Sequence, residues 1–161
     1  MNDDRLIFVT GYFGAKVLEE AQRIASCKGW SVLDLDRRIE EKDGRSIARL
    51  CMMSGEHAYR NAEFEAIEEI CAAEAGREPG LVVACGDGVL YDDDSREKIL
   101  QHELIIAGED MEVEELWENA RQDGATYHAF MKFGTEDEKK QKFEEHHARQ
   151  QELFQQVREN R

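Results

Sequence analysis

The chain has few basic residues and a single proline. Across its 161 residues, 21 Lys and Arg stand against 36 Asp and Glu, which gives a formal net charge of −15. Surfaces that bind nucleic acid or anionic membranes are rich in Lys and Arg, so this balance argues against both kinds of partner. It also works against binding a nucleotide polyphosphate unless basic residues are concentrated locally.

Long apolar runs are missing too. None reaches the length of a membrane-spanning helix, and the first residues, MNDDRLIFVTG, carry no apolar core of the signal-peptide kind. The four cysteines are scattered, with no C-x-x-C pair and no metal-ligand spacing. We therefore expect a reduced, cytoplasmic setting.

The apolar runs that are present predict strands alternating with helices. Buried strands are expected at Leu6–Thr10, Trp30–Leu33, Leu81–Cys85 and Leu104–Ala107. Helices are expected at Val17–Ser26, Val113–Arg121 and 135–161, with two more in Ser46–Ala75 separated near Gly55 and a proline-containing loop at Gly76–Gly80. This order predicts a single three-layer α/β domain in which a parallel sheet of four to five strands is flanked by helices.

Charged residues follow the second predicted strand. Asp34 and Asp36 lie one residue apart at its end, and Arg60 comes later on a helical segment. Two nearby carboxylates suit a magnesium-dependent transfer, because hard oxygen ligands hold the ion or its waters and orient a hydroxyl. An arginine can hold a substrate carboxylate with two parallel hydrogen bonds.

From Asp34 to Glu63 the chain resembles the shikimate kinase family, whose pattern is D-x-D, I-E, G-x-S-I and G-E-x-x-F-R-x-x-E. The matching residues are Asp34-Leu35-Asp36, Ile39-Glu40, Gly44-Arg45-Ser46-Ile47 and Gly55 to Glu63, with Tyr59-Arg60 for F-R. The resemblance runs from residue 5 to about 121. It implies a P-loop kinase-like domain over residues 1–161, with a core at 1–121, a degenerate lid region at 122–134 and a terminal helix at 135–161.

The resemblance also implies a reaction and site residues. The family reaction is ATP-dependent phosphorylation of the shikimate 3-hydroxyl, with ATP and Mg²⁺ as cofactors and a shikimate-like hydroxy acid as acceptor. Asp34 would hold Mg²⁺, Asp36 would be the catalytic residue that orients the hydroxyl, and Arg60 would bind the carboxylate. The remaining acceptor-binding positions are Gly86, Asp87 and Gly88, which replace the family's G-G-G, and Arg149, which matches within one residue.

The phosphate loop, residues 11–18, departs from the family's G-x-x-x-x-G-K-[ST]. In that pattern backbone amides surround the phosphates, the lysine reaches them and the hydroxyl holds magnesium. The nucleotide-binding positions here are Gly11, Gly14, Ala15, Lys16 and Val17. Without gaps, Lys16 replaces the second glycine, Val17 the lysine and Leu18 the hydroxyl residue. A one-residue deletion returns Lys16 to the lysine position but still leaves no hydroxyl. Spacing to the following helix favours the ungapped alignment, in which a positive φ at Lys16 would cost about 1 kcal/mol.

Each candidate also has a structural interpretation. Asp34 and Asp36 are equally suited to capping the turn after a strand, and Arg60 to pairing with a neighbouring acid. A metal site at the adjacent His146 and His147 is disfavoured, because neighbouring helical residues point about 100° apart and no third ligand is evident.

Three functions therefore remain open. The first is a shikimate-kinase-like phosphotransferase. The second is a catalytically inactive relative that binds a small molecule or regulates, and the replacements in the phosphate loop favour it over the first. The third is an assembly protein that reaches a protein partner or a second copy through the terminal helix, whose apolar stripe includes Phe143, Leu153, Phe154 and Val157.

Overall fold

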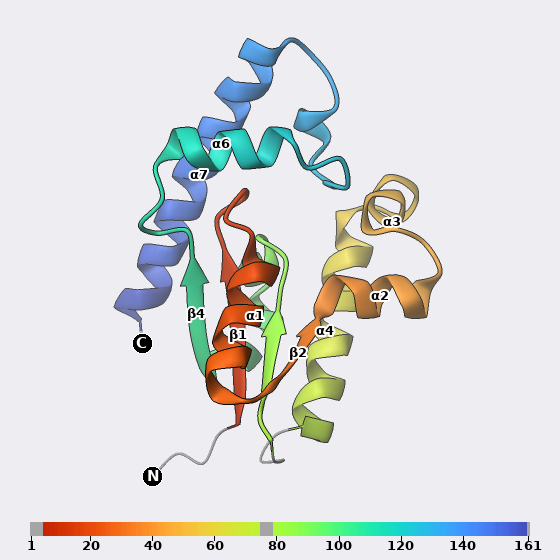
Figure 1. Ribbon diagram of the computed structural model, residues 1–161. Coiled ribbons are helices and arrows are strands. Elements are labelled where there is room, and N and C mark those ends of the chain that lie inside the picture. The colour runs from red at the N-terminus through yellow and green to blue at the C-terminus, as the bar shows by residue number, and fades with distance from the viewer. Residues whose placement is uncertain (1–4, 75–78, 161) are drawn as a thin grey trace.

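A computed structural model describes residues 5–74 and 79–160 of the chain; residues 1–4, 75–78 and 161 lie outside the described part. Its centre is a four-stranded parallel sheet in the order β2-β3-β1-β4 (Figure 1). The strands are β1 Leu6–Gly11, β2 Ser31–Asp34, β3 Leu81–Ala84 and β4 Glu103–Ala107. The expected parallel α/β sheet is confirmed, with four strands in the described residues.

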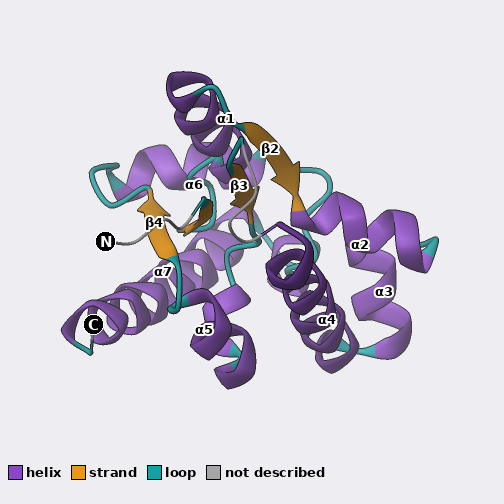
Figure 2. Cartoon of the chain, turned by 90° about the horizontal axis from the view of Figure 1, so that it is seen from below, coloured by secondary structure: helices purple, strands orange, loops and turns teal. Residues whose placement is uncertain are grey.

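Helices cover both faces of the sheet. They are α1 Val17–Lys28, α2 Leu35–Asp43, α3 Ile47–Ser54, α4 Glu56–Glu74, α5 Asp93–Ile99, α6 Val113–Arg121 and α7 Glu136–Glu159, with 3₁₀ turns η1 Val89–Tyr91 and η2 Ala129–Met131. Viewed end-on, α1 lies on one side of the sheet, and α4, α5 and α7 lie on the other (Figure 2). All six residues of β1 are buried between these layers, which explains its unbroken apolar sequence.

Two helices were missed by the sequence analysis. Helix α2 is mostly charged and buries only Leu35 and Ile39, so its apolar period is too weak to read. Helix α5 has seven residues and buries only Ser95 and Ile99. The expected break near Gly55 is confirmed, because α3 ends at Ser54 and α4 begins at Glu56. The loop expected at 76–80 falls largely outside the described residues.

The terminal helix, expected at 135–161, is α7. Its buried face consists of Phe143, His146, His147, Gln150, Phe154 and Val157. The apolar members of this face, together with the partly buried Leu153, pack on the chain's own core. An interface with another chain through α7 stays a prediction, and it would have to use other residues of the helix.

Among the described helices, none has both the length and the apolar character needed to cross a membrane. None of the four cysteines, all of which lie in the described residues, forms a disulfide, and only Cys85 is buried.

Candidate active site

The phosphate loop joins β1 to α1 and is strained at Lys16. This residue has φ 56° and ψ 58°, and among the described residues it is the only non-glycine with a positive φ. A left-handed conformation costs a residue with a Cβ about 1 to 2 kcal/mol. Lys16 thus has the backbone conformation that a glycine adopts most easily, as the ungapped alignment implied.

Three backbone amides near the start of the loop are already hydrogen-bonded within the protein. The N–H of Phe13 donates to the side-chain oxygen of Gln150 at 3.0 Å. The N–H of Tyr12 donates to Ala107 O at 3.2 Å, and that of Ala15 donates to Tyr12 O at 2.9 Å. Loops that bind phosphate direct backbone amides at the ligand. These three amides instead donate to acceptors within the protein, so they are not available to a phosphate.

Aromatic side chains hold the loop against α7 and the segment before it. The Phe13 ring lies 4.5 Å from His128 and 5.9 Å from Phe143, between ring centroids. The Tyr12 ring stacks on His147 at 4.8 Å. Phe13 is only 6% exposed, so the residues of the loop that follow β1 form part of the core.

A cavity of about 470 Å³, which we call the loop cavity, lies at the carboxyl ends of β2 and β3 beside the loop. Gly14, Ala15, Lys16 and Val17 contribute to its lining. Gly11 does not, because it packs so closely on Ala107 that a Cβ would overlap the carbonyl oxygen. The charged groups of the lining are Lys16 and four carboxylates: Asp34, Asp36, Asp87 and Asp123.

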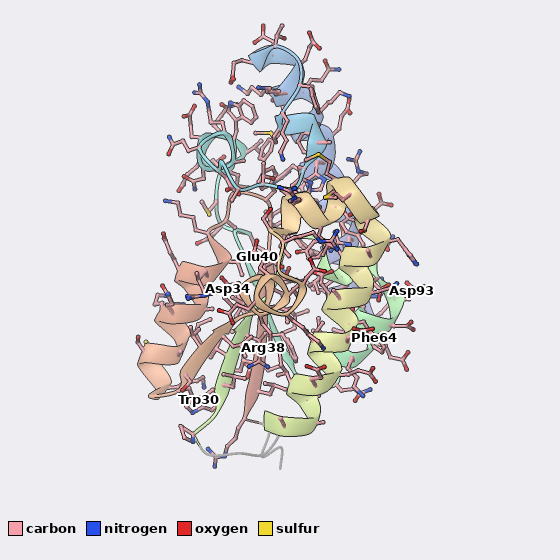
Figure 3. All side chains as sticks on the ribbon, turned by 90° about the vertical axis from the view of Figure 1, so that its right-hand side faces the viewer. Trp30, Asp34, Arg38, Glu40, Phe64 and Asp93 are labelled. Carbon is pink, nitrogen blue, oxygen red and sulfur yellow. The ribbon has the colours of Figure 1, made fainter. Side chains whose placement is uncertain are left out.

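The two carboxylates after β2 have different roles. Asp34 is the N-cap of α2 and accepts a long hydrogen bond of 3.5 Å from Arg37 N, which is the capping role considered from the sequence. Asp36 accepts a 2.6 Å hydrogen bond from the Tyr59 hydroxyl. Burial raises the pKa of Asp36 to about 6, although the bond from Tyr59 opposes the shift. Figure 3 looks along α2, with Asp34 labelled near its start.

Glu40, also labelled in Figure 3, belongs to the I-E of the family pattern. Its carboxylate accepts a 2.9 Å hydrogen bond from Ile47 N, in the first turn of α3. Ser46 is the N-cap of the same helix and accepts from Arg49 N. Glu40 and Ser46 thus help to fix the start of α3, one of the helices that line the second cavity described below.

Arg60 on α4 is paired within the protein, the alternative considered from the sequence. Nη1 donates to Glu63 at 2.6 Å, and Nη2 donates to Glu56 at 2.8 Å and to the Tyr127 hydroxyl at 2.8 Å. Burial alone would lower the pKa of Arg60, but the charge of Glu63 and these bonds raise it above its ordinary value, so the guanidinium stays charged. Burial raises the pKa of Glu63, whose second oxygen has no hydrogen-bond partner among the described residues.

A second cavity, of about 700 Å³, contains Arg60 in its lining, and we call it the acceptor cavity. Its charged residues are three basic ones, Arg60, Lys132 and Arg149, and one acidic one, Glu56. Arg149, assigned only loosely from the sequence, therefore lines the same cavity as Arg60. Asp36 lines the loop cavity instead.

Gly86 and Gly88, after β3, leave room for neighbouring side chains. A Cβ at Gly86 would overlap the Tyr59 hydroxyl, and a Cβ at Gly88 would overlap the Arg60 guanidinium. These two glycines therefore allow Tyr59 and Arg60 to lie against the loop that follows β3.

Asp87 lies between these two glycines, and side-chain nitrogens of three other residues surround its carboxylate. It lies 3.0 Å from His128 Nε2, 3.1 Å from His146 Nε2 and 3.0 Å from Gln150 Nε2. Burial would raise the pKa of Asp87, but the two histidines outweigh it and hold the pKa well below its usual range. His128 and Gln150 were not predicted as site residues, because nothing in their local sequence marks them. Their partner Asp87 is 41 and 63 residues away.

The fold and the two cavities define the class of protein: an α/β domain of the P-loop kinase type. Solved shikimate kinases share this fold. The enzyme from Acinetobacter baumannii, in complex with shikimate, gives a TM-score of 0.78 at 23% identity over 94% of this chain and 79% of that one. The enzyme from Bacteroides thetaiotaomicron gives 0.78 at 20% identity over 94% and 82%.

The chain belongs to the shikimate kinase family, whose family model, "Shikimate kinase", matches residues 20–160. The shikimate kinase of Chlorobaculum tepidum is 36% identical over 106 residues, 66% of this chain and 53% of that protein. That of Chlorobium limicola is 31% identical over 106 residues, covering 66% and 51%. The aligned part of the chain thus spans about half the length of the curated relatives it matches.

Proposed function

We propose that this shikimate-kinase-like chain binds a small hydroxy acid in the acceptor cavity, and that phosphoryl transfer from ATP is impaired or lost. The observation that carries the proposal is the contrast in charge between the two cavities. Three basic residues and one acidic residue line the acceptor cavity, whereas four carboxylates and one lysine line the loop cavity. The first arrangement suits an anionic ligand, and the second repels a triphosphate.

The residues of the phosphate loop do not fit MgATP. Val17 and Leu18 stand where the family has a lysine and a hydroxyl, and neither supplies a charge or an oxygen ligand. The amides of Phe13 and Ala15 are bonded within the protein. The match to the family model begins at residue 20, after the loop. ATP and Mg²⁺, with Asp34 as a metal ligand, belong only to the competing proposal of an active kinase.

Arg60 is the residue that we propose to hold the ligand's carboxylate. Its bonds use both Nη2 protons and one Nη1 proton, out of five donors. A grip through two parallel bonds therefore requires one Nη2 partner to leave. Glu56, whose side chain is 62% exposed, is the freer partner. In this proposal the incoming carboxylate replaces that of Glu56, and Arg149 adds a second positive charge. Asp36 lines the loop cavity, so it faces the hydroxyl only if the ligand extends from the acceptor cavity towards the loop cavity. The shikimate bound to the structural neighbour makes shikimate the first ligand to try.

Titration calorimetry with shikimate tests this proposal. We expect Arg60→Ala to weaken binding at least tenfold, because the ligand's carboxylate loses its charged partner. Glu56→Ala should tighten binding several-fold, since a competing carboxylate is removed, and Glu68→Ala, an exposed change of equal charge on the same helix, should leave it unchanged. Equal affinity in the wild type and in Arg60→Ala would remove the acceptor cavity from the proposal.

A second titration, with MgATP, tests the proposal that phosphoryl transfer from ATP is impaired or lost. We expect no measurable binding and no shikimate-dependent release of ADP in a coupled assay. Micromolar MgATP binding with turnover would identify a working kinase. The reduced, cytoplasmic setting and any partner bound through α7 remain proposals that neither experiment addresses.

A further inference from the structure

We propose that Asp87, His128 and His146 form a binding site for a divalent transition-metal ion. These three residues, the Asp87 cluster, are unrelated to the magnesium position that the family resemblance assigns to Asp34. The inference is also independent of whether the acceptor cavity binds a hydroxy acid.

The distances within the Asp87 cluster suit a metal ion. Asp87 Oδ2 lies 3.0 Å from His128 Nε2 and 3.1 Å from His146 Nε2, and one ligand atom from each residue falls within 4.8 Å of the others. Metal–ligand bonds of about 2.0 to 2.2 Å at tetrahedral or octahedral angles place neighbouring ligand atoms about 2.8 to 3.6 Å apart. Two of the three separations already fit. The third, between the two histidine nitrogens, is at most 4.8 Å and has to shorten when both bind one ion.

One oxygen of Asp87 is crowded by possible hydrogen-bond partners. Three side-chain nitrogens, Nε2 of His128, Nε2 of His146 and Nε2 of Gln150, converge on Asp87 Oδ2, an oxygen with two lone pairs. Oδ1 receives only the longer approach of His128 at 3.2 Å. If both histidines carry their proton on Nδ1, each Nε2 is free to bind an ion beside Oδ2, and the crowding is relieved.

A neighbouring residue fixes the orientation of the carboxylate. The Gln150 amide donates to Asp87 Oδ2 at 3.0 Å and to Asp87 O at 3.2 Å. The Gln150 oxygen accepts from Phe13 N at 3.0 Å, which sets the way the amide is turned. Metal ligands are commonly held by such supporting hydrogen bonds, and these supports tune affinity.

The cluster combines burial with access. His128 is 8% exposed and His146 is 7% exposed. Both line the acceptor cavity, while Asp87 lines the loop cavity. An ion held by three protein ligands would therefore have its remaining coordination position near a space that admits a water molecule or a small ligand.

The ligand set selects the class of ion. Two imidazole nitrogens and one carboxylate oxygen suit Zn²⁺, Fe²⁺, Co²⁺ and similar ions, whereas Mg²⁺ prefers oxygen ligands alone. Zn²⁺ is the probe for affinity. Co²⁺ is the probe for geometry, because its visible absorption reports the number and kind of ligands.

The experiment uses the full chain, without a histidine tag, treated with a chelator and returned to metal-free buffer. We expect one equivalent of Zn²⁺ to bind with micromolar affinity or tighter, and 1 mM Mg²⁺ not to compete. His128→Ala and His146→Ala should each weaken binding at least tenfold. His57→Ala, which removes an exposed histidine on α4, should leave it unchanged. Binding should also weaken from pH 7.5 to pH 5.5, because protonated imidazole cannot bind metal.

Two further variants separate this site from others. Cys71 Sγ and His102 Nε2 lie 3.6 Å apart and offer a competing position, so Cys71→Ser must retain Zn²⁺ binding. Asp87→Asn keeps the shape of the side chain, so the variant is expected to fold, and circular dichroism checks that it does. This variant must bind Zn²⁺ more weakly than the wild type and must change the Co²⁺ spectrum. The proposal is overturned if the wild type binds no Zn²⁺, if the two histidine variants bind as the wild type does, or if Cys71→Ser abolishes binding.

Discussion

The backbone N–H of Phe13 donates a 3.0 Å hydrogen bond to the side-chain oxygen of Gln150, 137 residues further along the chain. The bond joins the loop after β1 to helix α7. Because the amide group of Gln150 also donates to Asp87, one side chain connects the phosphate loop, the terminal helix and the loop after β3.

Replacing Gln150 should therefore destabilise the protein. Gln150→Ala leaves Phe13 N–H without a buried acceptor and removes a donor from Asp87. Because Gln150 is completely buried, we expect a loss of about 1 to 3 kcal/mol in the free energy of unfolding. Urea denaturation measures it. Gln151→Ala, an exposed change on the same helix, should stay within about 0.5 kcal/mol of the wild type. Equal stability of the two variants would mean that the Phe13–Gln150 bond contributes little.

Lys16 should be a position where glycine stabilises. Its φ of 56° is strained for any residue with a Cβ, so Lys16→Gly is expected to raise the free energy of unfolding by about 1 kcal/mol. Gln22→Gly, at an exposed position inside α1, should instead lower it by about 0.5 to 1 kcal/mol. Thermal melts of Lys16→Gly and Gln22→Gly measure the two effects. If both variants lose similar amounts of stability, the backbone at Lys16 is not strained. Lys16→Gly should not restore MgATP binding, because Val17 and Leu18 are unchanged.

Replacing Gly88 even with alanine should destabilise the protein. A Cβ there meets the guanidinium of Arg60, which three partners hold in place. We expect Gly88→Ala to cost about 1 to 3 kcal/mol of stability and to weaken shikimate binding by displacing Arg60. A Cβ at Gly124 meets nothing within 4 Å, so Gly124→Ala is the matched control and should be neutral or slightly stabilising. The prediction fails if both variants melt at the wild-type temperature.

The pH dependence of stability should report on Asp36. Burial raises its pKa to about 6 from an ordinary value of 3.8, and the charges of Asp34, Asp87 and Glu40 add to the shift. Between those values the folded state binds more protons than the unfolded state at this group, so its contribution to stability falls as pH rises and then levels off above about pH 6.

Asp36→Asn removes this dependence while keeping an oxygen for the Tyr59 hydroxyl. The stability of the variant relative to the wild type should therefore increase by about 1 to 2 kcal/mol between pH 5 and pH 8. Urea denaturation at the two pH values measures the change. Asp94→Asn, on an exposed carboxylate of α5, should show no such increase. A relative stability that does not vary with pH would show that Asp36 titrates normally in the fold.

The sheet could be predicted from the sequence because each of its strands is an apolar run between polar segments. β1 and β3 are buried along their whole length, so their side chains give a signal without reference to the rest of the fold. Helix α2 gave none, because most of its residues are charged and it is held by an Asp34 cap and two buried side chains. Such a helix depends on tertiary packing, which local periodicity does not report.

The candidate site was predictable in part. The pattern around Asp36 and Arg60 pointed to groups that the structure does place near the two cavities. The partners of Asp87 could not be predicted, because His128, His146 and Gln150 reach it from distant segments. His146 and His147 were rightly expected to diverge: one contacts Asp87 and the other stacks on Tyr12. His146 does have two potential co-ligands, Asp87 and His128, but only the folded chain brings them close to it.

The contacts of Tyr127 and His128 have a consequence for motion. The family resemblance predicts that residues 122–134, which include both, correspond to a lid. Here the Tyr127 hydroxyl is hydrogen-bonded to Arg60 on α4, and His128 is hydrogen-bonded to Asp87 in the loop after β3. Two neighbouring residues of the segment are therefore bonded to the core of the domain. An outward movement of this segment would break both hydrogen bonds and would remove a partner from the Arg60 guanidinium and from the Asp87 carboxylate at the same time. Amide hydrogens next to these residues should then exchange with solvent on the slow timescale of the core rather than that of a freely hinged flap.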